Sequence, residues 1–211
     1  TSAPDVIFHN GTILTMETVQ PEVQAIAIEG NLIIATGNNK EILDLQHEQT
    51  RLVDLGGKTR MPGIVDPHSH LFHSGGAALG FTCDEARQWA LENGITAQGE
   101  AFVNAEMLEN IQNFEQEGKL IIRTSQYLRY TNACGVLLDN FWLDHPRTDA
   151  WGEKLRIAGV KVFTDGGTCG ECAVSFEYTT GGYGDLWFTQ EELNNILSEI
   201  HDAGHQVLFH A

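Results

Sequence analysis

The sequence has few basic residues and no long apolar segment. Its 211 residues include 12 lysines and arginines against 29 aspartates and glutamates, a formal net charge of −17. This charge repels nucleic acid and anionic lipid, so we expect neither as a partner. No run approaches the roughly 18 apolar residues of a membrane helix, and the first residues lack the pattern of a secretory leader. We therefore expect a cytoplasmic protein that does not bind membranes.

Cysteine is also scarce. Four cysteines are too few for a disulfide scaffold in a chain of this size. Cys169 and Cys172 form a Cys-x-x-Cys motif, which also occurs in half of a zinc site or in a redox pair. A second such pair is missing, and no strand-to-helix context of the thioredoxin type surrounds the motif. We therefore favour structural or incidental cysteines.

The first 59 residues carry the pattern of a small β-rich domain. The segments "DVIFHNGTILTM" and "VQAIAIEGNLIIATG" alternate apolar and polar residues, and Asn10-Gly11 and Gly30-Asn31 stand where turns are needed. One short helix is predicted within residues 39–50. These strands are too few for a closed sandwich, so residues 1–59 are predicted to form part of a composite β-sandwich.

Strands and helices alternate from residue 60 to residue 211. Capping boxes at Thr82/Glu85 and Thr189/Glu192 precede two predicted helices. A third helix is predicted in 105–119 and a fourth within 139–159. Alternation of this kind indicates parallel strands joined by right-handed crossovers. The strands are predicted at 63–70, 95–103, 120–128, 160–166 and 206–210.

The length of this second region bears on the architecture. A (β/α)8 TIM barrel takes about 250 residues, or roughly 30 per unit, so residues 60–211 supply about five units. The predicted fold is α/β, a TIM-type barrel truncated to about five strands. An open doubly wound sheet is the competing architecture, but no Gly-x-Gly-x-x-Gly follows the first strand. The open edges of such a barrel favour a homo-oligomer.

Metal-ligand residue types stand where the predicted strands end. The first strand runs into "DPHSH", and strand alternation directs Asp66, His68 and His70 the same way. Lys161 lies on the fourth strand and His210 ends the fifth. Barrel enzymes keep their sites at this rim. The alternative for each histidine taken alone is a loop or core residue with ordinary hydrogen bonds.

Lys161 lies within the apolar run "VKVF", where a charged ammonium group is costly. Burial lowers the pKa of a lysine, and a neutral amine can take up carbon dioxide to form a carbamate. That anion can bridge two metal ions. The alternative is an ordinary surface lysine.

Three further histidines and one glutamate are also of residue types that bind metals or substrates. His73 and Glu100 are candidates for substrate binding. His201 and His205 are four residues apart, but Gly204 interrupts the helix between them. We therefore interpret this pair as favourable charges near a helix C-terminus.

Three motifs, in order along the chain, carry a resemblance. "LGGKTRMPGIVDPHSH" resembles the first barrel strand of the metal-dependent amidohydrolase superfamily. "RIAGVKVFTDGG" followed by "TQEELNNILSEIHDAGHQVLFHA" is similar to the branch that includes N-substituted formamide deformylase. The N-terminal strands resemble the small β-domain of that family. The segment after His70 is short, whereas members of this branch often carry a long insertion there. The family also takes a histidine from strand six and an aspartate, its general base, from strand eight, and neither strand is present.

The resemblance implies an enzyme that cleaves a C–N bond, of the amide or formamide type, through a metal-activated water. His68 and His70 would hold one metal, His210 would help to hold a second, and carboxylated Lys161 would bridge them. Asp66 would orient an imidazole. One or two divalent ions, zinc by default, and a small-molecule substrate are implied.

Two alternatives stay open at this point. One is a ring deaminase with a single metal, in which Lys161 is an ordinary lysine. The other is a catalytically incomplete fragment that serves only as a folded or oligomerising module.

Overall fold

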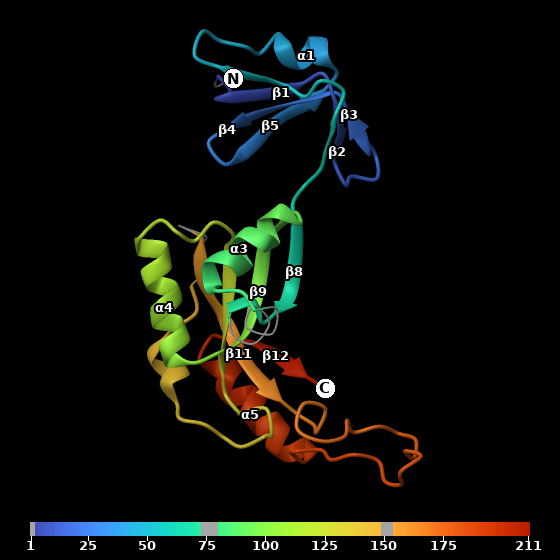
Figure 1. Cartoon of the computed structure of the whole chain (residues 1–211), viewed down its shortest axis with the longest axis vertical. Coiled ribbons are helices and arrows are strands. Elements are labelled where there is room, and N and C mark those ends of the chain that lie inside the picture. The colour runs from blue at the N-terminus through green and yellow to red at the C-terminus, as the bar shows by residue number, and fades with distance from the viewer. Residues whose placement is uncertain (1–2, 73–79, 149–153) are drawn as a thin grey trace. The chain divides into compact units, whose positions relative to one another are not determined.

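The computed structural model describes residues 3–72, 80–148 and 154–211. Within it the chain divides into two compact units, Thr1–Gly63 and Ile64–Ala211. Figure 1 shows the small strands of the first unit and the longer strands and helices of the second. No helix in the described parts of the chain is long and apolar enough to cross a membrane.

The first unit is built from short strands in two mixed sheets. The larger sheet has the order β5-β4-β1-β6 and the smaller one the order β3-β2-β7. A capping box formed by Asn38 and Glu41 begins the one helix, which is shorter than predicted because Asp44 already caps its end. The bounds are β1 Val6–His9, β2 Thr12–Leu14, β3 Glu22–Val23, β4 Ala25–Glu29, β5 Leu32–Gly37, α1 Asn39–Leu43, β6 Arg51–Asp54 and β7 Thr59–Arg60.

The second unit is a five-stranded parallel sheet in the order β12-β11-β10-β9-β8. It confirms the predicted α/β barrel type with about five strands, together with small N-terminal sheets. The predicted strands 95–103 and 206–210 match the observed bounds. The elements are β8 Ile64–Ser69, α3 Cys83–Glu92, β9 Ile95–Val103, α4 Ala105–Gln116, β10 Arg123–Arg129, η2 Phe141–Asp144, β11 Leu155–Phe163, α5 Gln190–Asp202 and β12 Gln206–His210.

The core of this unit lies between the sheet and its helices. Leu108 of α4 and Ile196 and Ile200 of α5 pack on the side chains of β9, β10 and β11. Trp142 packs in the same core and is fully buried. Removing such side chains from water is the main contribution to folding, on the order of 1.5–3 kcal/mol for each large apolar residue.

The fourth predicted helix is wrong for the described part of its range. Between 139 and 159 the structure has only the 3-10 turn η2, and β11 already begins at Leu155. Asn140 makes no capping bond, and Pro146 follows shortly after the turn, where its ring prevents a helix from continuing. Residues 149–153 of that prediction lie outside the described residues.

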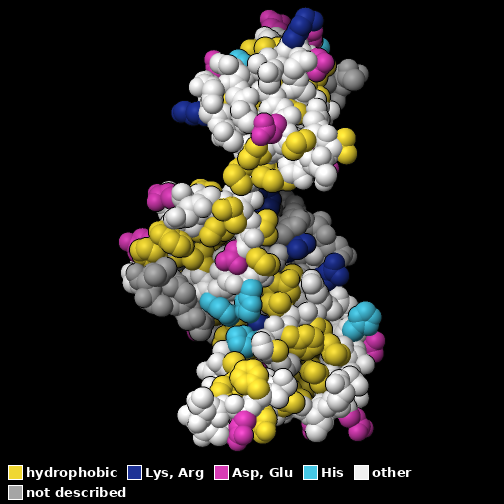
Figure 2. Space-filling view, turned by 90° about the vertical axis from the view of Figure 1, so that its right-hand side faces the viewer, with side chains coloured by type: hydrophobic (Ala, Val, Ile, Leu, Met, Phe, Trp, Pro, Cys, Tyr) yellow, Lys and Arg dark blue, Asp and Glu magenta, His cyan; other side chains and the backbone are white. Residues whose placement is uncertain are grey.

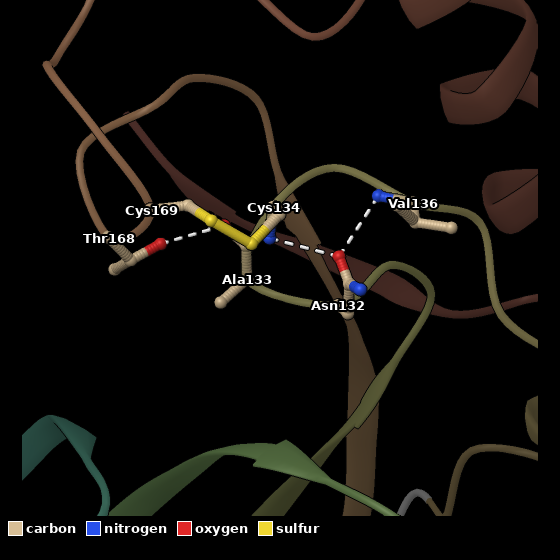
Figure 3. The surroundings of a disulfide bond; sticks show 6 residues. All are labelled: Asn132, Ala133, Cys134, Val136, Thr168 and Cys169. Carbon is tan, nitrogen blue, oxygen red and sulfur yellow. Dashed lines mark hydrogen bonds between the residues drawn. A yellow bond between two sulfur atoms is a disulfide. The ribbon is translucent and has the colours of Figure 1, made fainter.

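Cys134 and Cys169 form a disulfide, which the composition did not lead us to expect. Figure 3 shows that it joins the segment after β10 to the loop after β11. The hydroxyl of Thr168 donates a hydrogen bond to the carbonyl of Ala133 beside it, and Asn132 accepts the amides of Cys134 and Val136. Cys172 is exposed and free, so the Cys-x-x-Cys motif is not an internal pair.

Candidate metal centre

The structure gathers His68, His70, Lys161 and His210, which come from three strands of the sheet. The ring centroid of His68 lies 5.3 Å from that of His70 and 6.1 Å from that of His210. Nζ of Lys161 lies 3.2 Å from Nε2 of His68. Figure 2 shows histidine side chains together on one face of the second unit. These four side chains therefore lie close together, and their predicted role as metal ligands stays a prediction.

The end of β8 departs from a regular strand where it carries the histidines. Its pairing with β9 shifts register between Asp66 and Ser69, so the alternation assumed from the sequence is interrupted there. Gly99 of β9 faces this irregularity, since a Cβ atom on it would collide with the carbonyl oxygen of Pro67. A bulge of this kind re-aims side chains next to functional sites. It leaves His68 exposed and His70 half-buried.

Lys161 is fully buried although it carries an amine. Its Nζ atom donates to the carbonyl of Phe209 at 3.3 Å and lies 5.2 Å from the ring centroid of Phe163. The ion pairs of the described residues do not include it. Burial lowers the pKa of Lys161 to about 8, because the charged form loses its hydration. A substantial fraction of this amine is therefore neutral just above neutral pH.

Phe163 contacts the ring of His210, and Thr164 holds its backbone. Its ring stacks on Phe163 with 4.9 Å between centroids, and its carbonyl accepts bonds from the amide and hydroxyl of Thr164, at 3.0 and 2.7 Å. Burial, followed by the charge of Lys161, lowers the pKa of His210, and the charge of Asp165 opposes this. The pKa of His68 is lowered by burial first and then by Lys161. Neutral imidazoles are the form that binds metal.

Asp66 and Glu100 contact backbone rather than a ring nitrogen in the bonds that the structure gives. Asp66 Oδ1 accepts the amide of His68 at 3.2 Å. Glu100 is fully buried, and its Oε2 accepts the amide of Phe72 at 2.9 Å. Burial raises the pKa of Glu100 to about 8. The roles predicted for them, orienting an imidazole and binding substrate, stay predictions.

The predictions for the other histidines have different outcomes. His73 lies outside the described residues. His205 is buried with its ring edge against Trp142, 5.7 Å between centroids, and the helix before it ends at Asp202. Burial lowers the pKa of His205, so this residue is a core histidine and not the favourable charge at a helix C-terminus that we predicted for it. Within the described ranges, no three or more His, Cys, Asp and Glu side chains are arranged to hold a metal ion as they stand.

Sequence reasoning missed the supports of this centre. The stacking of Phe163 on His210 and the two bonds from Thr164 follow from the register of β11 beside β12, in which Phe163 pairs with His210. That register could be predicted only in part, because the predicted fourth strand begins at residue 160, five residues after β11 begins at Leu155. The sequence held one indication of the disulfide, the isolated Cys134 in the segment that follows the strand next to β11.

Comparison with known proteins defines the class of protein first. No family model matches the chain. A solved metal-dependent hydrolase of uncharacterized function from Pyrococcus horikoshii has the same fold, with a TM-score of 0.79 and 20% identity over 98% of this chain and 65% of its own. The chain thus shares its fold with this protein over about two thirds of that protein's length.

Sequence relatives then give the family. Imidazolonepropionase of Fusobacterium nucleatum is 32% identical over 111 residues, 53% of this chain and 26% of that enzyme. N-substituted formamide deformylase of Arthrobacter pascens is 28% identical over 71 residues, 34% of this chain and 13% of its own. These partial matches relate the chain to the amidohydrolase superfamily of metal-dependent hydrolases. The matches span about a quarter or less of these curated relatives.

Proposed function

We propose that the protein of which this chain forms at least a part hydrolyses a C–N bond, of the amide or formamide type, in a small molecule. The observation that carries the proposal is the position of Lys161. This fully buried amine has no carboxylate partner among the described residues and lies 3.2 Å from His68, beside two more imidazoles. A lysine is seldom buried without a partner unless its altered pKa has a use.

The donor set fits a metal ion once Lys161 becomes an anion. The neutral Nζ attacks the carbon of carbon dioxide, an N–C bond forms, one C–O π pair moves to oxygen, and the proton lost from Nζ passes to solvent water. The product is a carbamate whose charge is opposite to that of the ammonium. His68, His70, His210 and the carbamate would then hold one or two divalent ions, with zinc favoured by imidazole and carboxylate-like ligands.

When bound, such a metal lowers the pKa of a water and polarises a carbonyl group. The residues of this chain contribute the rest. Phe163 fixes the plane of the His210 ring, and Thr164 fixes its backbone, so the imidazole is oriented before any ligand arrives. Asp66 holds the backbone of His68.

Zinc titration of the chelator-stripped chain, with and without bicarbonate, tests the proposal. We expect bicarbonate to tighten binding, a carbamate signal in the ¹³C NMR spectrum when ¹³C-bicarbonate is supplied, and loss of both in Lys161→Ala. His68→Ala should lose zinc as well. Zinc binding that is absent in the wild-type chain, or undiminished in His68→Ala, would contradict it.

One observation favours a second candidate, a ring deaminase with a single metal. Lys161 already has two polar contacts, His68 Nε2 and the carbonyl of Phe209, without any modification. In that case one equivalent of zinc binds without bicarbonate, and no carbamate signal develops. The same titration therefore separates the two.

A third candidate concerns the chain by itself as an oligomerising module. β8 and β12 have a strand neighbour on one side only in the described sheet, and unpaired edges template association. Sedimentation of the purified chain measures this directly. A monomer at all concentrations would exclude the homo-oligomer.

A further inference from the structure

Side-chain hydrogen bonds hold the segment that follows the last ladder pair of β8 and β9, Ser69 with Glu100, next to the two histidines. The register of β8 and β9 shifts between Asp66 and Ser69. Beyond the shift, Leu71 and Phe72 direct their amides to Ser69 and Glu100. Backbone amides that leave a sheet need partners elsewhere, and here the partners are specific side chains.

Two sets of hydrogen bonds, which we call together the bracket, hold this segment. Gln98 Oε1 accepts the hydroxyl of Ser69 at 2.9 Å, and Ser69 Oγ accepts the amide of Leu71 at 3.1 Å. Glu100 Oε2 accepts the amide of Phe72 at 2.9 Å. Ser69 stands between His68 and His70, so the bracket encloses the histidine pair.

The cost of burying these groups indicates that the arrangement has a use. Glu100 is fully buried, and Gln98 is 2% exposed. Oε1 of Glu100 and Nε2 of Gln98 have no hydrogen-bond partner among the described residues. A buried carboxylate with an unsatisfied oxygen is expensive, and such groups call for an explanation other than packing.

Apolar packing also fixes the position of the segment that follows His70. The ring of Phe72 is buried with Ile111 of α4 and Leu120 in a small apolar cluster. The amide bonded to Glu100 and the ring held by α4 belong to the same residue. Glu100 therefore fixes the backbone two residues after His70.

We infer that Gln98 and Glu100 are positioning residues, which hold His68 and His70 in the orientation that a divalent cation requires. The inference rests on the proposed function for the metal itself. It adds the role of β9, a strand without a metal ligand in the proposed set. Groups that orient metal ligands typically change metal affinity by about 10- to 100-fold when removed.

The test is cobalt(II) binding to the wild-type chain and to variants, followed by visible absorption and by affinity. Glu100→Leu is expected to weaken binding by about tenfold or more and to shift the cobalt bands. Glu100→Gln keeps an acceptor for the Phe72 amide and is expected to restore affinity and spectrum. Wild-type affinity and bands in folded Glu100→Leu would overturn the inference.

Glu115 offers a matched control. Its Oε1 accepts the amides of Lys154 and Leu155 at 2.7 Å each, which is the same kind of bond at the start of β11. Glu115→Leu should lower the melting temperature yet leave the cobalt spectrum unchanged. An equal loss of affinity in Glu115→Leu and Glu100→Leu would mean general destabilisation and would overturn the inference.

Two further measurements keep the test decisive. If Glu100→Leu does not fold, Ser69→Ala removes the other set of hydrogen bonds with a minimal change and is expected to weaken cobalt binding. Unchanged cobalt binding in Ser69→Ala contradicts the inference.

If the wild-type chain binds no cobalt, the proposed function fails, and amide hydrogen exchange then tests the bracket by itself. Slow exchange that becomes fast at Phe72 in folded Glu100→Leu, or at Leu71 in Ser69→Ala, supports it, whereas fast exchange at both amides in the wild-type chain overturns it.

Discussion

Nζ of Lys161 lies 3.2 Å from Nε2 of His68, although the two residues are 93 positions apart in the chain. Lys161 comes from β11, an inner strand of the sheet, and His68 from the edge strand β8. A cationic lysine at this place would repel the very cation that imidazoles bind. Binding of a cation by these imidazoles is therefore favourable only if the amine is neutral or has been converted to an anion.

Replacement of Lys161 by methionine should separate stability from metal binding. Methionine fills a similar volume without an amine, so we expect equal or greater stability in urea unfolding together with a loss of bound zinc. Lys154→Met, at an exposed lysine, is the control and should change neither quantity. Zinc content measured by elemental analysis that equals the wild-type value in Lys161→Met would contradict the proposed role.

Removal of the disulfide should destabilise the second unit. Cys134 and Cys169 are separated by 35 residues, and a bridge that closes such a loop typically contributes about 2–4 kcal/mol. We expect the double variant Cys134→Ser/Cys169→Ser to lose stability of that order in urea unfolding. Cys172→Ser, at an exposed free thiol, should be neutral.

Thiol counting checks the same bond without mutation. Alkylation of the denatured chain should label Cys83 and Cys172 before reduction, and also Cys134 and Cys169 after it. Labelling of all cysteines without a reductant would show that the bond is absent from the protein tested.

Gly159→Ala should disturb the centre indirectly, through the position of β12. Gly159 pairs with Gln206, and a Cβ atom on it would collide with the carbonyl oxygen of that residue. β12 must then move away from β11, and His210 moves with it. We expect a loss of about 1–3 kcal/mol and weaker zinc binding.

Gly170→Ala is the matched glycine control, because a Cβ atom there meets nothing closer than 3.8 Å. It should retain both stability and zinc affinity. If Gly159→Ala binds zinc as the wild-type chain does, the position of β12 does not matter for the centre.

The sequence allowed β9 and β12 to be predicted to the residue, because each is an apolar run that begins just after a helix has ended. β10 begins at Arg123 rather than Leu120, since Leu120 is buried in a side cluster with Phe72 and takes no part in the ladder. β11 begins at Leu155, earlier than predicted, because Leu155 and Arg156, which are half-buried, already pair with Thr124 and Ser125 of β10. Burial and pairing are separate properties, and hydrophobicity reports only the first.

For the site, the parallel order of strands was enough to bring His68, Lys161 and His210 together. It was not enough to show what supports them. The sequence predicts substrate binding for Glu100, whereas in the structure the amide of Phe72 donates to its carboxyl group just beyond the register shift between β8 and β9. Such contacts depend on a register shift that no periodicity in the sequence encodes.

The two buried ionisable groups should give the stability an unusual pH dependence. Glu100 has its pKa raised from 4.5 to about 8, so the folded state binds more protons than the unfolded state between these values. Its contribution to stability therefore falls as pH rises from 4.5 to 8. Lys161 has its pKa lowered from 10.5 to about 8, so the unfolded state binds more protons above 8, and stability is regained as pH rises toward 10.5.

These opposite slopes predict a minimum of stability near pH 8 in metal-free protein. Each tenfold difference in proton affinity between the folded and unfolded states corresponds to about 1.4 kcal/mol, so the minimum is deep enough to measure by urea unfolding from pH 5 to pH 10. Glu100→Gln should abolish the fall below pH 8, and Lys161→Met should abolish the rise above it, since each variant removes one titrating group. If both variants keep the wild-type curve, other groups determine the pH dependence, and Lys161 and Glu100 do not titrate as their burial requires.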